Sequence, residues 1–283
     1  MKFGIQTKVT LSSMAVTELA PAIEERGLES LFLAEYTHIP KRHKSPFGGP
    51  LPEPFFNSFD PLITLAAAAQ VTRQIILGTS VMVVVQRDPI VLAKEVATLD
   101  QLSGGRFVLG VGAGGIAEAN LNHGVTPGQR WQVLREKVLA LKEIWSSAEP
   151  EFHGELINFD PIYSNPKPKR PGGPPILLGG HVPRTIERAA EYCDGWFPGF
   201  GYGSFDLRAG IDAFRRAAER AGRSPDSLAV NVVSVPIDET KLRPLLDMKI
   251  ERIVFQVPSE PRETMLPILD RCAEVTRRLG ARG

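Results

Sequence analysis

The sequence predicts an α/β fold, a closed (β/α)8 TIM barrel, from three observations. Strand-like and helix-like segments alternate along the whole chain, which is typical of a parallel sheet. The alternation repeats eight times within 283 residues, the size expected of one such barrel. Hydrophobic residues make up 43% of the chain and charged residues 23%, enough apolar material for one large core. We therefore expect one domain over residues 1–283.

The first half of the chain contains four strand–helix units. Asp60-Pro61 and Asp88-Pro89 each combine a side chain that caps a helix with a proline at the first helical position. Gly27 and Gly104 follow helical segments and predict their ends. The expected strands are 2–6, 30–35, 75–85 and 106–111, and the expected helices are 15–26, 61–71, 89–102 and 129–146.

The second half supplies four more units and one of two insertions. The expected strands are 176–178, 196–198, 228–236 and 252–257, and the expected helices are 184–192, 206–221, 239–248 and 262–279. A small hairpin is predicted at 150–160, with its turn at Gly154-Glu155. The other insertion is the proline-rich stretch 36–58, which has no hydrophobic period and is predicted to be a long loop.

Charge and composition exclude several classes of function. The formal net charge of +1 provides no strong field for nucleic acid or an anionic membrane. No apolar run approaches the ~20 residues that span a bilayer, and the first residues lack the apolar core of a signal peptide. We therefore expect a cytoplasmic protein, with Cys193 and Cys272 as reduced, buried thiols. The histidines lack metal-ligand spacing, so no metal site is expected.

Two glycine-rich turns follow expected strands. Gly110–Gly115 fits the dinucleotide pattern GxGxxG, but it ends the fourth strand and enters a loop instead of opening a helix in the first unit. Its bare backbone could still accept a flat ring or a phosphate, or it could form a tight turn. The second turn, 179–184, precedes a helix and carries Arg184. It is either a phosphate-binding turn or an ordinary helix start.

The loop after the second strand carries Glu35, Tyr36 and His38. A carboxylate, a phenol and an imidazole at the mouth of a barrel can move protons, so we expect these three residues to be catalytic. The competing interpretation of a histidine in a loop is an ordinary surface residue.

Several strings in the chain resemble those of a known family. They are Arg87-Asp88-Pro89, Ala93-Lys94, Thr98 to Arg106 (TLDQLSGGR), Leu109 to Gly114 (LGVGAG), Pro175 to Gly180 (PILLGG) and Ala189 to Trp196 (AAEYCDGW). Together they resemble the luciferase-like monooxygenase superfamily, and within it the branch that uses the deazaflavin coenzyme F420. The resemblance implies a (β/α)8 barrel, a homodimer, a small-molecule substrate and a cofactor ring at the barrel mouth.

The resemblance also implies positions for the cofactor. A non-proline cis peptide would support the ring at Ser80-Val81, and Glu35 would contact the ring region. The remaining expected cofactor-binding residues are Val83, Ala113, Gly114 and Glu118 near the ring and Gly179, Gly180, Val182, Pro183 and Arg184 around a phosphate. Whether Lys167, Lys169 and Arg170 meet an acidic cofactor tail or form a solvated link is left open.

Two positions depart from the family's deazaflavin sugar-phosphate dehydrogenases. Those enzymes have a histidine and a glutamate, their acid and base, where this chain has Tyr36 and Gly115. The departure argues against sugar-phosphate oxidation, although His38 or Glu118 could take over a proton-transfer role. Four phenylalanines near the long loop favour an apolar substrate or simple packing: Phe47, Phe55, Phe56 and Phe59.

The resemblance leaves three hypotheses about function. The first is an oxidoreductase that transfers a hydride between coenzyme F420 and an organic substrate. The second is an FMN-dependent monooxygenase that uses oxygen and a partner reductase. The third is an F420-binding protein without catalysis, because the family's acid and base are missing.

Overall fold

Eight parallel strands close into a barrel in the computed structural model, which describes residues 1–46, 48–201, 203 and 205–280. Each strand pairs with the next around the ring, and pairing of β3 with β5 closes it. The predicted TIM barrel is therefore confirmed. Its strands are β1 (Lys2–Thr7), β2 (Ser30–Leu33), β3 (Ile76–Thr79) continued by β4 (Met82–Val83), β5 (Phe107–Gly112), β8 (Ile176–Gly179), β9 (Gly195–Phe197), β10 (Ala229–Val235) and β11 (Arg252–Gln256).

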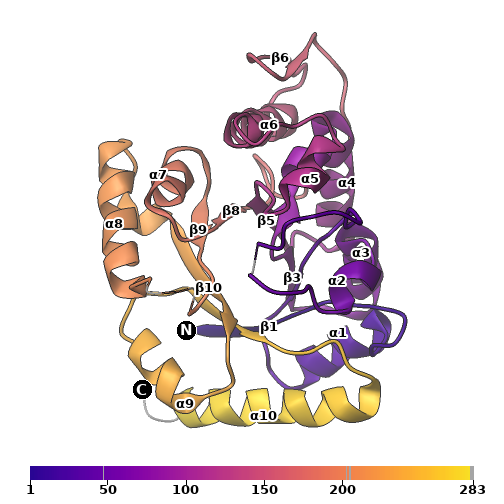
Figure 1. Ribbon diagram of the computed structural model, residues 1–283, viewed down its shortest axis with the longest axis vertical. Coiled ribbons are helices and arrows are strands. Elements are labelled where there is room, and N and C mark those ends of the chain that lie inside the picture. The colour runs from indigo at the N-terminus through magenta and orange to yellow at the C-terminus, as the bar shows by residue number, and fades with distance from the viewer. Residues whose placement is uncertain (47, 202, 204, 281–283) are drawn as a thin grey trace.

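Helices surround the barrel as a ring, with α7 and α8 on one side and α3 and α4 on the other (Figure 1). The long helices are α1 (Val16–Glu25), α3 (Pro61–Val71), α4 (Pro89–Leu102), α6 (Arg130–Ser146), α7 (Pro183–Tyr192), α8 (Leu207–Arg220) and α10 (Arg262–Gly280). Asp60 and Asp88 accept two backbone N–H groups each at the starts of α3 and α4, as predicted. All barrel strands end on one face, which we call the mouth; the opposite face is the base.

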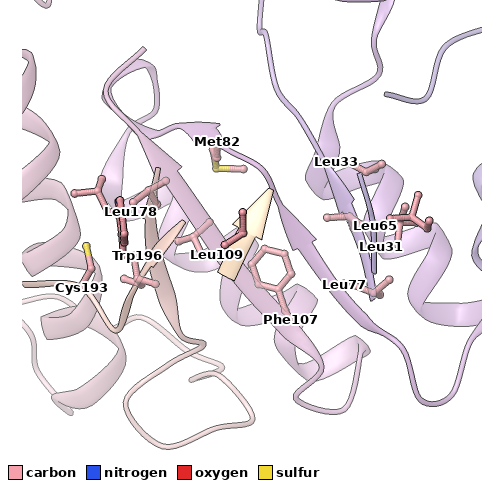
Figure 2. Packing of buried hydrophobic residues seen from close by; sticks show 14 of the residues in the cluster. Leu31, Leu33, Leu65, Leu77, Met82, Phe107, Leu109, Leu178, Cys193 and Trp196 are labelled. Carbon is pink, nitrogen blue, oxygen red and sulfur yellow. The ribbon is translucent and has the colours of Figure 1, made fainter. Parts of the chain in front are cut away.

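The core forms two layers, because strand side chains alternate between the barrel interior and the surrounding helices. Figure 2 shows part of the outer layer, where Leu31, Leu77 and Leu109 are labelled. The inner layer fills the barrel with Phe32, Val108, Leu177, Phe197, Val233 and Val254. Cys193 and Cys272 are both buried and unpaired, which confirms the prediction for the thiols.

Four predicted segments differ in detail from the structure. The expected single strand 75–85 is broken between β3 and β4 and ends in a 3-10 turn, Val84–Gln86. The long loop contains a one-turn helix, α2 (Pro54–Asn57), and the stretch before residue 128 contains α5 (Ala117–Leu121). The expected helix 239–248 ends as α9 (Glu239–Leu242) and continues as a 3-10 turn at 243–245, where Pro244 offers no N–H donor.

The predicted hairpin is present as β6 (Phe152–His153) and β7 (Asn158–Phe159), which pair antiparallel. It extends outward beyond α6 (Figure 1). Glu136 of α6 anchors it by accepting the N–H groups of Leu156 and Ile157 at 2.8 and 2.9 Å. Within the described ranges, no helix is both long and apolar enough to cross a bilayer.

Candidate active site

Val81 lies at the top of the barrel interior, between two glycines of neighbouring strands. A Cβ atom on Gly112 would lie 2.7 Å from one methyl group of Val81, and a Cβ atom on Gly179 would lie 2.8 Å from the other. No real side chain tolerates such distances, so glycine at both positions lets Val81 fill the mouth. The peptide bond between Ser80 and Val81 is cis, as the resemblance implied.

Polar side chains lie at the same level of the barrel as Val81. The Gln6 amide donates to the Ser80 carbonyl oxygen at 3.1 Å and accepts from the Ser234 hydroxyl at 3.1 Å. Among the described residues, the buried Ser80 hydroxyl finds no hydrogen-bond partner. A cavity of about 340 Å³ opens beside these hydrogen-bonded side chains, at the ends of β10 and β11. Its lining includes Ser234, Gln256 and Pro258. The mouth thus combines hydrogen-bonded polar side chains, an unpartnered hydroxyl group and a neighbouring cavity.

Glu35 is buried two residues beyond the end of β2 and uses both of its carboxylate oxygens within the protein. One oxygen accepts the Val83 N–H at 2.7 Å, and the other accepts from the Arg87 guanidinium, with Nε at 2.9 Å. Arg87 also pairs with Asp60 and with Glu95. Burial raises the pKa of Glu35, and the contacts with Arg87 and the Val83 N–H oppose that rise. This arrangement suits a residue that supports β4 more than one that delivers protons to a ligand.

Tyr36 and His38 lie close to Glu35 in sequence but have separate surroundings. The Tyr36 ring packs against Phe55, with centroids 4.9 Å apart, in a small apolar cluster under the long loop. His38 contacts the Thr37 hydroxyl through Nδ1 at 3.0 Å and the Asn122 amide through Nε2 at 2.9 Å, so both ring nitrogens are engaged.

The phenylalanines of the long loop divide between packing and exposure. Phe55 joins the apolar cluster with Tyr36, whereas Phe56 and Phe59 are exposed. Phe47 lies outside the described residues. The contact with Tyr36 shows that packing accounts for Phe55 at least in part.

The turn after β5 is held by side chains from α5 and α6. The Asn120 amide donates to the Ala113 carbonyl oxygen at 3.0 Å, and Arg130 donates to that of Gly114 at 3.3 Å. Glu118 accepts the Lys44 N–H at 3.2 Å, which ties α5 to the long loop. Its second oxygen is buried and finds no partner among the described residues.

The turn after β8 leads directly into α7. Val182, Pro183 and Arg184 are exposed there, at a helix start that leaves N–H groups without partners inside the helix. The Thr185 hydroxyl is buried and has no hydrogen-bond partner among the described residues, and Trp196 donates to the Gly180 carbonyl oxygen at 2.7 Å. A cleft of about 350 Å³ between α7 and α8 adjoins this turn.

The basic cluster 167–170 lies at the base of the barrel, because it directly precedes β8. Arg170 pairs with the buried Asp100 at 3.1 Å, and Lys167 donates to the Ile144 carbonyl oxygen at 2.6 Å. Two members of this cluster therefore serve the protein's own structure, at the end of the barrel opposite the mouth.

Lys8 was not expected at the site. It directly follows β1, and its Nζ lies 3.8 Å from the centroid of the Phe55 ring. Burial lowers the pKa of Lys8 to about 8. Within the described part of the chain, its ammonium forms no salt bridge or hydrogen bond. The available signal was its spacing of two residues from Gln6, which points both side chains to the same side of the strand.

Comparison with known proteins identifies the family. Residues 1–238 match the model of the luciferase-like monooxygenases. The chain belongs to this family. An uncharacterized protein of Mycobacterium tuberculosis is 31% identical over 280 residues, covering 96% of this chain and 98% of the relative. An F420-dependent glucose-6-phosphate dehydrogenase of Nakamurella multipartita is 31% identical over 244 residues, covering 83% of this chain and 67% of the relative.

Two solved structures of oxidoreductases have the same fold. A monooxygenase from Streptomyces bottropensis superposes with a TM-score of 0.78 at 20% identity, covering 97% of this chain and 98% of its own. An F420-dependent secondary alcohol dehydrogenase, solved with an F420–acetone adduct, superposes with a TM-score of 0.76 at 18% identity and the same coverage. At these identities the likeness establishes the shared barrel alone.

Proposed function

We propose that the protein is an oxidoreductase that transfers a hydride between coenzyme F420 and an organic substrate. Family membership supports an oxidoreductase, and the relative from Nakamurella multipartita is named as F420-dependent. The observation that carries the proposal is the packing of Val81 against two residues without side chains, Gly112 and Gly179. This apolar surface adjoins the hydrogen bond between Gln6 and Ser80. A flat ring needs such a surface to lie against.

The residues present fit this coenzyme at both of its ends. Ser80 offers an unpartnered buried hydroxyl next to the surface for the ring. The turn 179–184 offers a helix start, a cationic Arg184 and the unpartnered Thr185 hydroxyl, which suit a phosphate. We propose that Ser80, Val81, Val83, Ala113 and Gly114 border the ring and that Gly179, Gly180, Val182, Pro183 and Arg184 hold the phosphate. Glu35 and Glu118 would support these surfaces from below and from α5.

The bound coenzyme supplies a carbon atom that gives or accepts a hydride, and the protein's residues orient the partners and control protons. Gln6 holds the Ser80 carbonyl group, and Arg87 with Glu35 holds β4 beside it. The apolar cluster of Tyr36 and Phe55 covers one side of the mouth and keeps water away from it.

Paired titrations with F420 and with FMN test this proposal. Trp196 contacts Gly180, so quenching of its fluorescence reports on the expected phosphate turn. We expect tighter binding of F420 than of FMN, and a large loss of F420 affinity in Gly179→Ala, whose new Cβ atom would collide with Val81. Gly128→Ala is the control, because a Cβ atom there meets nothing within 4 Å.

The other outcomes of these titrations decide between the remaining hypotheses. Preference for FMN, followed by oxygen-dependent turnover of reduced FMN, would replace the proposal with a monooxygenase that needs a reductase. Tight F420 binding without turnover of alcohols, ketones, enones or quinones would indicate a binding protein. Binding of neither cofactor would contradict both oxidoreductase hypotheses.

We also propose that residues 1–283 act as one cytoplasmic domain that assembles as a homodimer. The surfaces of α3 and α4 support a dimer, because these adjacent helices expose Ile63, Val71 and Val91. Helices that are apolar on their outer side commonly have that side covered. A single species of monomer mass in sedimentation at micromolar concentration would contradict the homodimer.

A further inference from the structure

We propose that Lys8 is a catalytic residue that exchanges a proton with the oxygen atom of a carbonyl or alcohol substrate. The inference rests on the proposed hydride transfer and names the proton partner and the substrate class for it.

The position of Lys8 follows from the geometry of β1. The Gln6 side chain points into the barrel, because it contacts the Ser80 carbonyl group and Ser234. Side chains two residues apart in a strand share a side, so Lys8 is directed inward one residue beyond the end of β1, above the level of Gln6. It therefore lies at the mouth, where its Nζ contacts the Phe55 ring of α2.

The half-buried ammonium of Lys8 has no opposite charge beside it among the described residues. It contacts the face of Phe55, and no described carboxylate pairs with it. By contrast, Arg87 pairs with Glu35, and Arg252 at the base pairs with Glu29. A partly desolvated charge without a counter-charge suits a residue that a ligand or a reaction uses.

The acidity of Lys8 suits proton transfer near neutral pH. Burial lowers its pKa to about 8, and general acids and bases work best when their pKa lies near the working pH. Two other proton-transfer candidates are engaged within the protein: both oxygens of Glu35 accept hydrogen bonds, and both ring nitrogens of His38 have polar neighbours.

In the direction of reduction, the substrate carbonyl carbon receives a hydride from reduced F420. The electron pair of the C=O π bond moves to the oxygen, which forms an O–H bond with a proton from Lys8 as its N–H bond breaks. The product is an alcohol, and Lys8 is left as a neutral amine. Bound F420 would supply the hydride and, with loss of one ring N–H proton to solvent, would account for the two electrons that the substrate gains. Solvent returns a proton to Lys8.

Three variants test the role of Lys8: Lys8→Met, Lys8→Arg and the control Lys2→Met, which makes the same change at the base end of the same strand. With reduced F420 and cyclohexanone, we expect kcat to fall by about 10²–10³ in Lys8→Met while the F420 dissociation constant stays within about threefold. Lys8→Arg should lose kcat as well, because a guanidinium does not release its proton. Full kcat in Lys8→Arg would overturn proton transfer in favour of simple charge attraction.

A second readout needs neither coenzyme nor substrate. Acetic anhydride labelling of the free protein, followed by mass spectrometry across pH 6–11, measures the pH at which each lysine becomes reactive. We expect half-maximal labelling of Lys8 near pH 8. Half-maximal labelling of Lys8 near the ordinary lysine pKa of about 10.4, or unchanged kcat in Lys8→Met, would overturn this proposal alone. Failure of the wild-type protein to bind F420 would overturn the proposed function itself.

Discussion

Lys137 is buried and Lys8 is half-buried, and desolvation lowers the pKa of each to about 8. Lys137, on α6, donates to the carbonyl oxygens of Val85 at 2.9 Å and Arg87 at 2.6 Å and so holds the turn after β4. Lys8, at the mouth, contacts only an aromatic face among the described groups. The same pKa shift thus accompanies two different roles, and the hydrogen-bond partners of each lysine tell them apart.

Carboxylates and guanidinium groups show the same division. Arg87, Glu35 and Asp60 form a connected group on the mouth side in which each charge has an opposite partner. Glu118 has one buried oxygen without a partner among the described residues. Complete pairing suits a group that holds the third strand in place, whereas Glu118 keeps one hydrogen-bond acceptor unused.

The largest effect that the comparison predicts is for Arg87→Met. This change leaves Glu35 buried without its counter-charge, and breaking a buried pair in this way costs about 3–5 kcal/mol of unfolding free energy. Urea unfolding at pH 7 measures the loss. The double variant Arg87→Met/Glu35→Gln should recover part of it, because the unpaired charge is gone. No recovery would mean that the arginine acts mainly through packing.

Lys137→Met should have the next largest effect. Removing the ammonium leaves the Val85 and Arg87 carbonyl oxygens without a donor, which costs about 2–3 kcal/mol of unfolding free energy. Arg135→Met on the same helix is the control, because its exposed pair with Glu191 contributes at most about 1 kcal/mol. If both variants unfold at the same urea concentration, the structural role of Lys137 is wrong.

Lys8→Met should have the smallest effect on stability, and of opposite sign. An apolar side chain at this half-buried position removes a charge that has no opposite partner among the described residues, so we expect the unfolding free energy at pH 7 to rise by about 1 kcal/mol and Tm by about 2–4 °C. Lower stability in Lys8→Met would show that the contact with Phe55 stabilises the fold.

The difference in unfolding free energy between the wild type and Lys8→Met should change with pH in one direction. The pKa of Lys8 falls from 10.5 to about 8 on folding, so between pH 8 and 10.5 the unfolded chain binds more protons than the folded one. The unfolding free energy of the wild type should therefore rise with pH in this window relative to that of Lys8→Met. Urea unfolding at pH 7 and pH 10 measures the difference, and Lys2→Met should follow the wild type.

Local signals were sufficient to predict most of the fold. Asp60-Pro61 and Asp88-Pro89 marked the starts of α3 and α4, because a capping side chain and a proline act through their nearest neighbours along the chain. The apolar runs marked the strands, and the two glycine-rich turns marked places where β5 and β8 end at the mouth. The break within 75–85 was missed, although Gly78, Thr79 and Ser80 interrupt the apolar run where β3 ends.

The sequence by itself therefore determined the barrel, the order of its units, the family and the strand ends at which the site lies. Only the tertiary structure decided which of the charged residues there are paired. Glu35 and Arg87 are 52 positions apart, and Lys8 meets Phe55 across a loop, so their surroundings depend on contacts between distant segments. Burial and counter-charge set the pKa and the role of each group, and both arise only when the barrel closes.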